Sequence, residues 1–453
     1  MRLRDIFALC ALAFLANEVY AELSCKDMDG KDVDWFIALK MPSLDKKLDS
    51  VHPDISKGIA FFYADSNNQE FRISKANIND PKSALGYTVS QAIDAYQSTK
   101  KDTMYMFYND QQPCSENCPA VDDENSDKVG DDDSESEKEA QPKAPKKPAP
   151  KKSSKFEVFG KWVSQMMNKG EGKNGEKDLT NRAHAKGVMN FNDKQGFWLI
   201  HSSPRYNNPM SGKYFFPSNA RRNGQSFFCG TFLSDQLGEI SAQIFHSQFA
   251  IYQKNLPLEM AKKYPRLYHV IMMDKTVPSK SQCPYFRNAA LKTKGGQWLQ
   301  NYEKNVQADS DLYANQVTEG KQKSFFVETW LNGPRDWKNV CDGKFFTKNI
   351  RSLKHDQGIG WVSAKDHSKW AVSDQPKTVC IGDINRQKSQ RKRGGGTMCI
   401  DNEKIWKFFR DSVDVVECCE KEKAGTGNCE AMPDDSIDVP KANRKFGDPD
   451  PEK

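Results

Sequence analysis

Asp366-His367-Ser368-Lys369-Trp370-Ala371-Val372-Ser373-Asp374 is the stretch from which we infer the fold of this chain. It places an imidazole and an ammonium group at positions i and i+2, which point to the same face of an extended segment. His367 and Lys369 can therefore reach one small site together. The same spacing occurs at His184-Ala185-Lys186. A single His-x-Lys often arises by chance, whereas two copies in similar surroundings predict two equivalent structural units.

The pattern of a β-hairpin follows both pairs: an apolar segment, a turn-rich segment and a second apolar segment. These segments are 187–191, 192–196 and 197–200 after Lys186, and 370–372, 373–376 and 379–381 after Lys369. Each second strand should bring a polar side chain back beside its pair, His201 in the first copy and Asn385 in the second. Two unrelated hairpins in a large protein are the alternative interpretation.

Two imidazoles and two ammonium groups suit the cleavage of a phosphodiester. A neutral imidazole can attack phosphorus, and a protonated one can give its proton to the leaving oxygen. Lysines can hold the non-bridging oxygens while charge builds on them. The phospholipase D superfamily has a signature of the form His-x-Lys-x4-Asp. The second copy fits it with Asp374, whereas the first copy has Phe191 where the aspartate belongs.

The N-terminus predicts a signal peptide over residues 1–21, because Arg2 and Arg4 precede an apolar stretch that is too short to span a bilayer. No later segment is long and apolar enough to span, so we expect a soluble mature protein without membrane contact. Of the 12 cysteines, Cys10 lies in the signal. Secretion places the others in an oxidising route, which predicts disulfides.

Composition divides the rest of the chain. Residues 119–178 form a predicted disordered, charged insertion, because they carry too few apolar side chains to fold. A solvated spacer and a DNA-contacting lysine segment are the alternatives for its role. It interrupts a domain expected at 22–118 and 179–429, and residues 430–453 are expected to be a flexible tail. Strands are predicted at 33–40, 58–65, 104–110, 225–232, 267–271, 324–330 and 397–400, and helices at 83–96, within 233–252 and at 402–416.

A basic segment directly follows Asn385. Its cations are Arg386, Lys388, Arg391, Lys392 and Arg393, and three glycines come next. Basic side chains contact phosphates, and glycines let a backbone approach a ligand closely. We predict that these five side chains contact DNA; a solvated flexible loop is the alternative. The net charge of +6 agrees with a polyanionic partner but is spread over 453 residues.

Several of these stretches together resemble the deoxyribonuclease II family. The resemblance rests on Val33-Asp34-Trp35-Phe36, Phe107-Tyr108-Asn109-Asp110-Gln111, His184-x-Lys186-Gly187, Gly196-Phe197-Trp198-Leu199-Ile200-His201-Ser202-x-Pro204, Asp366-His367-Ser368-Lys369-Trp370, Cys380-Ile381-Gly382-Asp383-Ile384-Asn385-Arg386 and Arg393-Gly394-Gly395-Gly396-Thr397-x-Cys399. They cover most of the chain outside the insertion and the tail.

The resemblance implies an α+β fold of phospholipase D type, αββα, whose two pseudo-symmetric halves each give one His-x-Lys pair to a shared site. It implies an endonuclease that needs no metal or cofactor, works best in acid and leaves 3′-phosphate ends. His184, Lys186, His367 and Lys369 match the catalytic residues, with His184 expected as nucleophile and His367 as acid. His201 and Asn385 match residues that line the site, and Asp374 is included with them.

The resemblance also implies disulfides. They are Cys25 with Cys229, Cys380 with Cys399, and Cys341 with Cys418 or Cys419. DNA is the expected partner, and a homodimer is left open. The expected location is the extracellular space or the lysosome. The rival functions are a secreted, catalytically weak DNA-binding or host-interaction protein of the same fold, and a phosphodiesterase that acts on lipid head groups.

Overall fold

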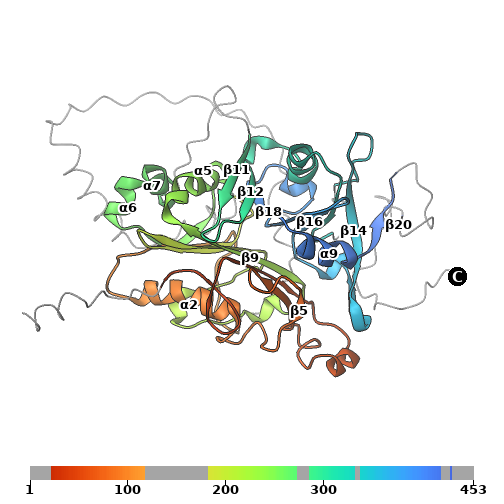
Figure 1. The fold of residues 1–453 in the computed structure, drawn as a ribbon, viewed down its shortest axis with the longest axis horizontal. Helices are drawn as coiled ribbons and strands as arrows, with labels where there is room; N and C mark the ends of the chain where they lie inside the picture. The colour runs from red at the N-terminus through yellow and green to blue at the C-terminus, as the bar shows by residue number, and fades with distance from the viewer. Residues whose placement is uncertain (1–21, 118–181, 273–284, 332–336, 420–428, 431–453) are drawn as a thin grey trace, which may run out of the picture.

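The computed structural model describes residues 22–117, 182–272, 285–331, 337–419 and 429–430 (Figure 1). It is a mixed α+β structure with two large sheets. The first sheet contains, in spatial order, β10 (Ile251–Asn255), β6 (Met104–Tyr108), β7 (Gly187–Phe191), β8 (Gln195–His201), β9 (Gln225–Leu233), β3 (Trp35–Lys40), β4 (Phe61–Asp65) and β5 (Arg72–Ile73). A small separate sheet pairs β1 (Cys25–Lys26) with β2 (Asp32–Val33).

The second sheet lies beside the first (Figure 1). Its spatial order is β11 (Phe286–Lys292), β12 (Trp298–Lys304), β18 (Gly395–Asp401), β17 (Thr378–Gly382), β16 (Trp370–Ser373), β13 (Phe325–Glu328), β14 (Thr347–Lys354), β19 (Val413–Glu417) and β20 (Cys429–Glu430), with β15 (Gly360–Val362) on β14. The helices are α2 (Ala84–Gln97), α5 (Leu237–Ser247), α6 (Leu258–Lys263), α7 (Pro265–Ile271), α8 (Glu319–Lys321) and α9 (Glu403–Ser412), and a π-helical segment, Tyr313–Thr318, precedes α8.

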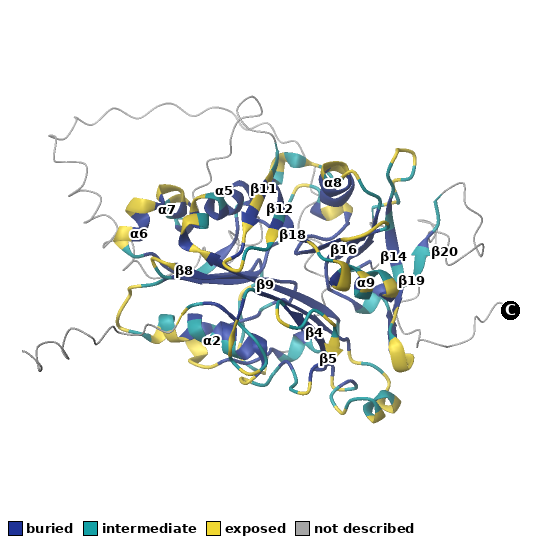
Figure 2. Cartoon of the chain, in the orientation of Figure 1, coloured by how far each residue is buried: buried dark blue, intermediate teal, exposed yellow. Residues whose placement is uncertain are grey.

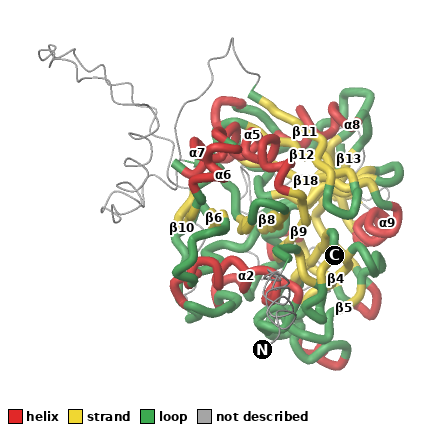
Figure 3. Tube along the Cα trace, turned by 60° about the vertical axis from the view of Figure 1, so that its left-hand side comes forward, coloured by secondary structure: helices red, strands yellow, loops and turns green. Residues whose placement is uncertain are grey.

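Alternating side chains give each sheet two apolar faces. In β8, Trp198 and Ile200 join the largest core cluster, which also contains Trp370 and Ile381 of the second sheet. The intervening residues of β8 face the outer cluster, in which α2 packs. The outer face of the second sheet packs against the π-helical segment. Most strands are therefore buried on both faces (Figure 2), with helices around them (Figure 3).

The two sheets repeat one pattern. Strands β6, β7, β8, β9, β3 and β4 pair antiparallel in that order, and β13, β16, β17, β18, β12 and β11 do the same. The registers correspond as well, because Gly187 opposes Ile200 and Trp370 opposes Ile381. The chain thus contains two similar halves. The repeat ends beyond β6, which pairs antiparallel with β10, whereas β13 pairs parallel with β14.

Both predicted hairpins are present, as β7–β8 and β16–β17. The strand predicted at 267–271 is wrong: these residues lie in α7, which begins at Pro265, a residue suited to the first helical turn. The helix predicted at 402–416 ends at Ser412, and the valine-rich segment that follows forms β19. The predicted signal peptide and insertion lie outside the described residues, as does the predicted tail apart from Glu430. In the part of the chain that is described, no helix is long and apolar enough to cross a membrane.

Three disulfides are seen among the described residues. Cys25–Cys229 and Cys380–Cys399 are the pairs that the family resemblance implied. Cys341 pairs with Cys419, so the alternative pairing with Cys418 is wrong. Cys418 and Cys114 are also disulfide-bonded.

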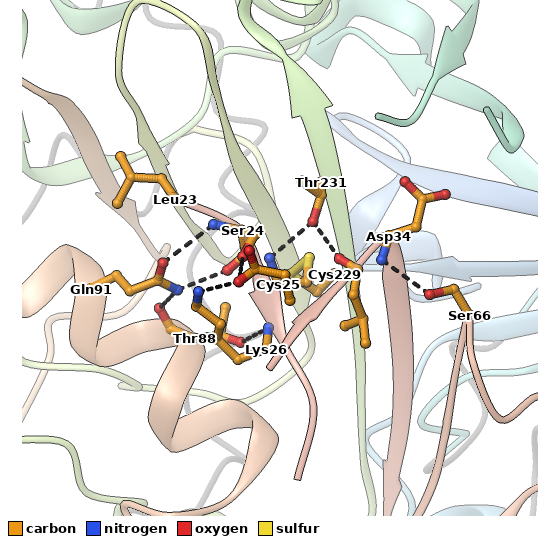
Figure 4. The surroundings of a disulfide bond; sticks show 12 residues. Leu23, Ser24, Cys25, Lys26, Asp34, Ser66, Thr88, Gln91, Cys229 and Thr231 are labelled. Atoms are coloured by element: carbon orange, nitrogen blue, oxygen red, sulfur yellow. Dashed lines mark hydrogen bonds and ion pairs between the residues drawn. A yellow bond between two sulfur atoms is a disulfide. The ribbon is translucent and has the colours of Figure 1, made fainter. Parts of the chain in front are cut away.

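The Cys25–Cys229 bond fixes the start of the described chain to the middle of the first sheet. Around it, the Cys25 amide donates to the Thr231 hydroxyl at 3.0 Å, and the Gln91 side chain of α2 donates to the Ser24 carbonyl at 2.7 Å (Figure 4). The bond closes a loop with a sequence separation of 204 residues. Such a long loop loses much conformational freedom in the unfolded chain when it is closed.

Replacing both Cys25 and Cys229 with alanine should lower the free energy of unfolding by about 2–5 kcal/mol. Urea titrations of the parent and the double variant, followed by tryptophan fluorescence, measure the difference. A change below about 1 kcal/mol would show that this link does not limit the unfolded chain.

Candidate active site

Equivalent backbone positions hold the two His-x-Lys pairs. Lys186 directly precedes β7 and Lys369 directly precedes β16, and the carbonyls of the two lysines accept from the amides of His201 at 3.0 Å and Gly382 at 2.8 Å. Each hairpin therefore closes over its own pair in the same way.

The two halves also exchange hydrogen bonds at the histidines. The His184 amide donates to the Gly394 carbonyl at 2.9 Å, and the His367 amide donates to the Gly224 carbonyl at 3.0 Å. Gly394 belongs to the second half and Gly224 to the first, so each histidine is held by a loop from the other half. This reciprocal exchange brings two residues that are far apart in the sequence to one site.

Both pairs line one small pocket of about 30 Å³. Its walls also include Gln111, Ser202, Pro204, Trp330, Asn385 and Gln390. Lys186 and Lys369 are each 2% exposed and His367 is 7% exposed, so four basic side chains meet in a nearly dry space. The pocket is small and is lined mainly by polar side chains.

In the first half, the orientation of His184 is set by the backbone. Its Nδ1 hydrogen-bonds to the carbonyl of Asp383, which can only accept, so Nδ1 carries the proton and Nε2 of the neutral ring carries the lone pair. The Lys186 Nζ lies 3.3 Å from Nε2. The Asp110 carboxylate lies 2.6 Å from that Nζ and 3.0 Å from Arg393 Nη2. Asp110 thus balances two cations beside the imidazole.

The second half has no carboxylate in the equivalent place. Asp110 stands two residues after Tyr108, which opposes Gly187, and Trp330 stands two residues after Glu328, which opposes Trp370. The Trp330 ring centroid lies 4.3 Å from that of His367. His367 Nε2 lies 3.1 Å from the Asn223 amide nitrogen. The two histidines therefore have different surroundings although their backbones match.

Burial and positive neighbours shift the protonation of the site. Burial, reinforced by Lys186, holds the pKa of His184 well below its ordinary value, and burial with Lys369 does the same to the pKa of His367. Burial and the Lys186 charge lower the pKa of Lys369 to about 7. Burial alone would raise the pKa of Asp110, but Lys186, His184 and Arg393 outweigh it and lower that pKa.

The Asp383 residue whose carbonyl binds His184 also forms a buried carboxyl pair with Glu303. An Asp383 carboxylate oxygen accepts from the Gly396 amide at 2.9 Å, and Glu303 accepts from Ser247 and Asn301. Burial and the proximity of Asp383 raise the pKa of Glu303 well above its ordinary value, and burial raises the pKa of Asp383 to about 7. At acid pH the pair is therefore protonated, and it adds little negative charge to the site.

The three glycines after the basic segment fit this packing. A Cβ at Gly396 would lie 2.3 Å from the Glu303 carboxyl carbon, and one at Gly395, where φ is +147°, would lie 2.8 Å from an Asp383 oxygen. A Cβ at Gly394 would lie 2.1 Å from the Ser247 carbonyl oxygen. Gly394 lets the two halves approach each other closely, and Gly395 and Gly396 leave room for the two buried carboxyl groups.

Two residues predicted to line the site lie elsewhere. The His201 ring is fully buried against Tyr206, at a centroid distance of 4.9 Å, and the next residue, Ser202, lines the pocket instead. Asp374 contacts Arg410 at 3.3 Å in the turn after β16. A strand advances about 3.3 Å per residue, so this turn is roughly 15 Å from Lys369. Asn385 does line the pocket.

The basic segment 386–393 is only partly available to DNA. Arg386 is completely buried and pairs with Asp311 at 2.8 Å, so the prediction that it contacts DNA is wrong. Arg391 pairs with Asp309 at 2.6 Å, and Arg393 pairs with Asp110. Lys388 and Lys392 are exposed. The sequence could not show which arginines have internal carboxylate partners, because the partners come from distant segments.

The surroundings that distinguish the two halves were also missed from sequence. Asp110 was noted only as part of a motif, and Asp383, Glu303, Trp330 and Asn223 were given no role. Asp110 and Asp383 follow strand-like segments at the same edge as the histidines, which is the signal that could have identified them. Asn223 and Glu303 carry no such signal in a single sequence.

The geometry defines a class of protein in which two similar halves, each with its own sheet, place two histidine–lysine pairs around one pocket. The chain belongs to the deoxyribonuclease II family, whose model, described as Deoxyribonuclease II, matches residues 24–133 and 152–419. Plancitoxin-1 of Acanthaster planci is 32% identical over 91% of this chain and 97% of its own. Cell-death-related nuclease 7 of Caenorhabditis elegans is 30% identical over 88% of both chains. Deoxyribonuclease-2-beta of Homo sapiens is 28% identical over 92% and 97%.

Replacing Asp110 with asparagine should lower the free energy of unfolding by about 3–5 kcal/mol, because Lys186 and Arg393 are left as uncompensated cations in a buried site. Added inorganic phosphate should restore part of the loss, since it can supply the missing negative charge. Thermal melts with and without phosphate test both effects.

Asp309→Asn is the matched control, because it removes the partner of a half-exposed arginine and should change the free energy of unfolding by less than about 1 kcal/mol. Equal losses for the two variants, or no response of Asp110→Asn to phosphate, would contradict the role given to Asp110.

Proposed function

We propose that this protein is an endodeoxyribonuclease of the deoxyribonuclease II type that cleaves DNA through a phosphohistidine, without a metal, and leaves 3′-phosphate ends. The observation that carries the proposal is the convergence of two histidine–lysine pairs on one small pocket. Two of these relatives are named as a nuclease and a deoxyribonuclease, which favours DNA as the substrate. The proposal includes a fold of phospholipase D type, which is supported by the two similar halves.

The first step makes a bond between nitrogen and phosphorus. His184 Nε2 attacks the scissile phosphorus while the bond to the 5′-oxygen breaks on the opposite side, and His367 gives that oxygen its proton. Lys186 and Lys369 hold the non-bridging oxygens, whose charge grows in the transition state. The 5′-hydroxyl strand leaves, and the phosphorus stays on the 3′-oxygen.

The second step reverses these roles. His367, now neutral, takes a proton from a water molecule whose oxygen attacks phosphorus as the bond to His184 breaks. The product is a 3′-phosphate, and both histidines return to their starting states. His184 is assigned as nucleophile because the Asp383 carbonyl holds its proton on Nδ1 and leaves Nε2 unprotonated.

The proposed compartment follows from the chemistry and the sequence. A lysosomal enzyme, or a secreted one that reaches an acidic space, meets the acid pH at which the depressed histidine pKa allows protonation. A signal peptide over residues 1–21 would direct it there. DNA is the proposed partner.

The pH dependence of cleavage should have a steep alkaline limb. The pKa of His367 is depressed, so the fraction that carries a proton grows only as the pH falls below about 6.5. Lys369, with a pKa of about 7, also loses charge as the pH rises. We expect kcat/KM on plasmid DNA to fall about tenfold per pH unit along this alkaline limb. We expect EDTA to leave kcat/KM unchanged. Nicking assays from pH 4 to pH 8 measure this; a rate that rises from pH 5 to pH 8, or is abolished by EDTA, would refute it.

An activated substrate separates the roles of the histidines. Thymidine 3′-(4-nitrophenyl phosphate) has a leaving group that needs no proton. His367→Ala should therefore release about one equivalent of nitrophenolate and then stop, with thymidine 3′-phosphate bound to His184, whereas His184→Ala should release none. Plasmid nicking should fall at least 10³-fold in both variants.

Mass spectrometry after an alkaline quench locates the adduct. An adduct on residue 367 would exchange the two roles, and turnover without any adduct would exclude the covalent route. If the parent protein binds DNA and leaves it uncut at every pH, the enzyme proposal fails and a non-catalytic DNA-binding protein is left. Release of a lipid head group without plasmid nicking would favour the lipid phosphodiesterase.

A further inference from the structure

Two buried lysines show that the basic segment after Asn385 has a counterpart in the first half of the chain. Lys40, at the end of β3, donates from Nζ to the carbonyls of Arg221 at 2.8 Å and Gly58 at 3.0 Å. Lys304, at the end of β12, donates to the carbonyls of Arg391 at 2.6 Å and Gln390 at 3.2 Å. The two lysines occupy equivalent places in the two halves.

The registers confirm that the loops held by these lysines are equivalent. Lys40 opposes Gln225 and Lys304 opposes Gly395, and both partners directly follow a loop that ends in glycine. We call residues 221–224 (Arg221-Arg222-Asn223-Gly224) the first basic loop and residues 391–394 (Arg391-Lys392-Arg393-Gly394) the second basic loop. Only the second was identified from the sequence.

The first basic loop reaches the site through His367. Its Gly224 carbonyl accepts from the His367 amide, and its Asn223 side chain contacts His367 Nε2. The Gly224 amide donates to the Lys365 carbonyl at 2.8 Å. The loop therefore lies on the side of the pocket where His367 would release the 5′-oxygen.

The charges of the two loops are used differently. In the second basic loop both arginines have carboxylate partners, Asp309 and Asp110. In the first basic loop neither Arg221 nor Arg222 makes an ion pair with any residue that the structure describes. Arg222 is exposed. The Nε of Arg221 is buried and has no acceptor within the described chain.

The nearest buried carboxyl does not supply that acceptor. Asp366 lies against Gly224, but its oxygens accept from the Trp361 indole at 2.7 Å and the Ser368 amide at 2.8 Å. A buried donor without an acceptor is unfavourable, and a guanidinium is shaped to bind a phosphate through two hydrogen bonds. The first basic loop thus has free positive charge and an unsatisfied donor beside the catalytic pocket.

We propose that Arg221 and Arg222 bind the DNA phosphate next to the scissile one, on the side of the leaving 5′-strand. The inference rests on the proposed function, whose reaction it supplements with a subsite for the phosphodiester backbone. Contacts to phosphate carry no base information, so the subsite strengthens binding equally for all sequences. In the other half, the second basic loop has the exposed Lys392 at the position equivalent to Arg222.

The test compares two charge-matched double variants. Arg221→Gln/Arg222→Gln removes the subsite. Lys194→Gln/Lys377→Gln removes the same charge from exposed turns at the opposite ends of the two hairpins. Affinity for a short DNA duplex is measured against salt concentration in the His184→Ala background, which prevents cleavage. Arg222→Gln alone is the fallback, because Arg222 is exposed and its replacement does not disturb a buried group.

The subsite variant should bind DNA at least tenfold more weakly, and the slope of log affinity against log salt should fall in magnitude by about 1, because the contact to one phosphate is lost. The turn variant should change the slope by less than about 0.5. In the parent background, the subsite variant should hydrolyse thymidine 3′-(4-nitrophenyl phosphate) at the parental rate, because that substrate has no phosphate next to the scissile one.

Each outcome separates the two proposals. Equal salt slopes for the two double variants would overturn the subsite while leaving the nuclease proposal intact. A protein that cleaves nothing but loses DNA affinity only in the subsite variant would keep the subsite and overturn the nuclease. Loss of nitrophenyl ester hydrolysis in the subsite variant would show that the loop acts on the chemistry and not on the neighbouring phosphate.

Discussion

The reciprocal backbone exchange between the halves is the constraint on which the site depends. Each half holds the other half's histidine by its amide, through the carbonyls of Gly224 and Gly394. Side chains adjust easily, whereas two backbones joined in this way have a fixed separation. The exchange needs close approach, and glycine at 394 supplies it, since a Cβ there would overlap with the Ser247 carbonyl oxygen of the first half. The positions of four basic side chains are thus set by main-chain geometry.

Charge balance then makes the two halves unequal. A nearly dry pocket that holds Lys186, Lys369 and two imidazoles is unfavourable for every positive charge in it. Asp110 compensates on the His184 side, and the indole of Trp330 stands in its place on the His367 side. The result is one histidine in a balanced environment and one in a cationic, aromatic environment. A symmetric frame with unequal charges is what a reaction needs when one histidine attacks and the other transfers a proton.

The sequence predicted the repeated part of the structure and missed the part that depends on contacts. Apolar segments on both sides of a turn-rich segment located both hairpins, because a strand that is buried on both faces is apolar along its length. Arg386 and Asp374 were misplaced because their environments come from Asp311 and Arg410, which lie far away in the chain. The first basic loop was overlooked because Arg221 and Arg222 are unremarkable in sequence. Only the register of β3 and β12 shows that they match a loop beside the site.

Acid conditions bring opposing demands on the folded state. The histidines have a depressed pKa, so the unfolded chain binds more protons at these positions below about 6.5, and they lower stability as the pH falls. Asp383 and Glu303 have a raised pKa, so their contribution is fully present below their ordinary pKa and is lost as the pH rises, for Asp383 through about 7. Between these limits the two slopes have opposite signs. A buried carboxyl pair behind His184 therefore offsets part of the destabilisation that protonation of the histidines causes, at the pH where the proposed chemistry requires a proton on His367.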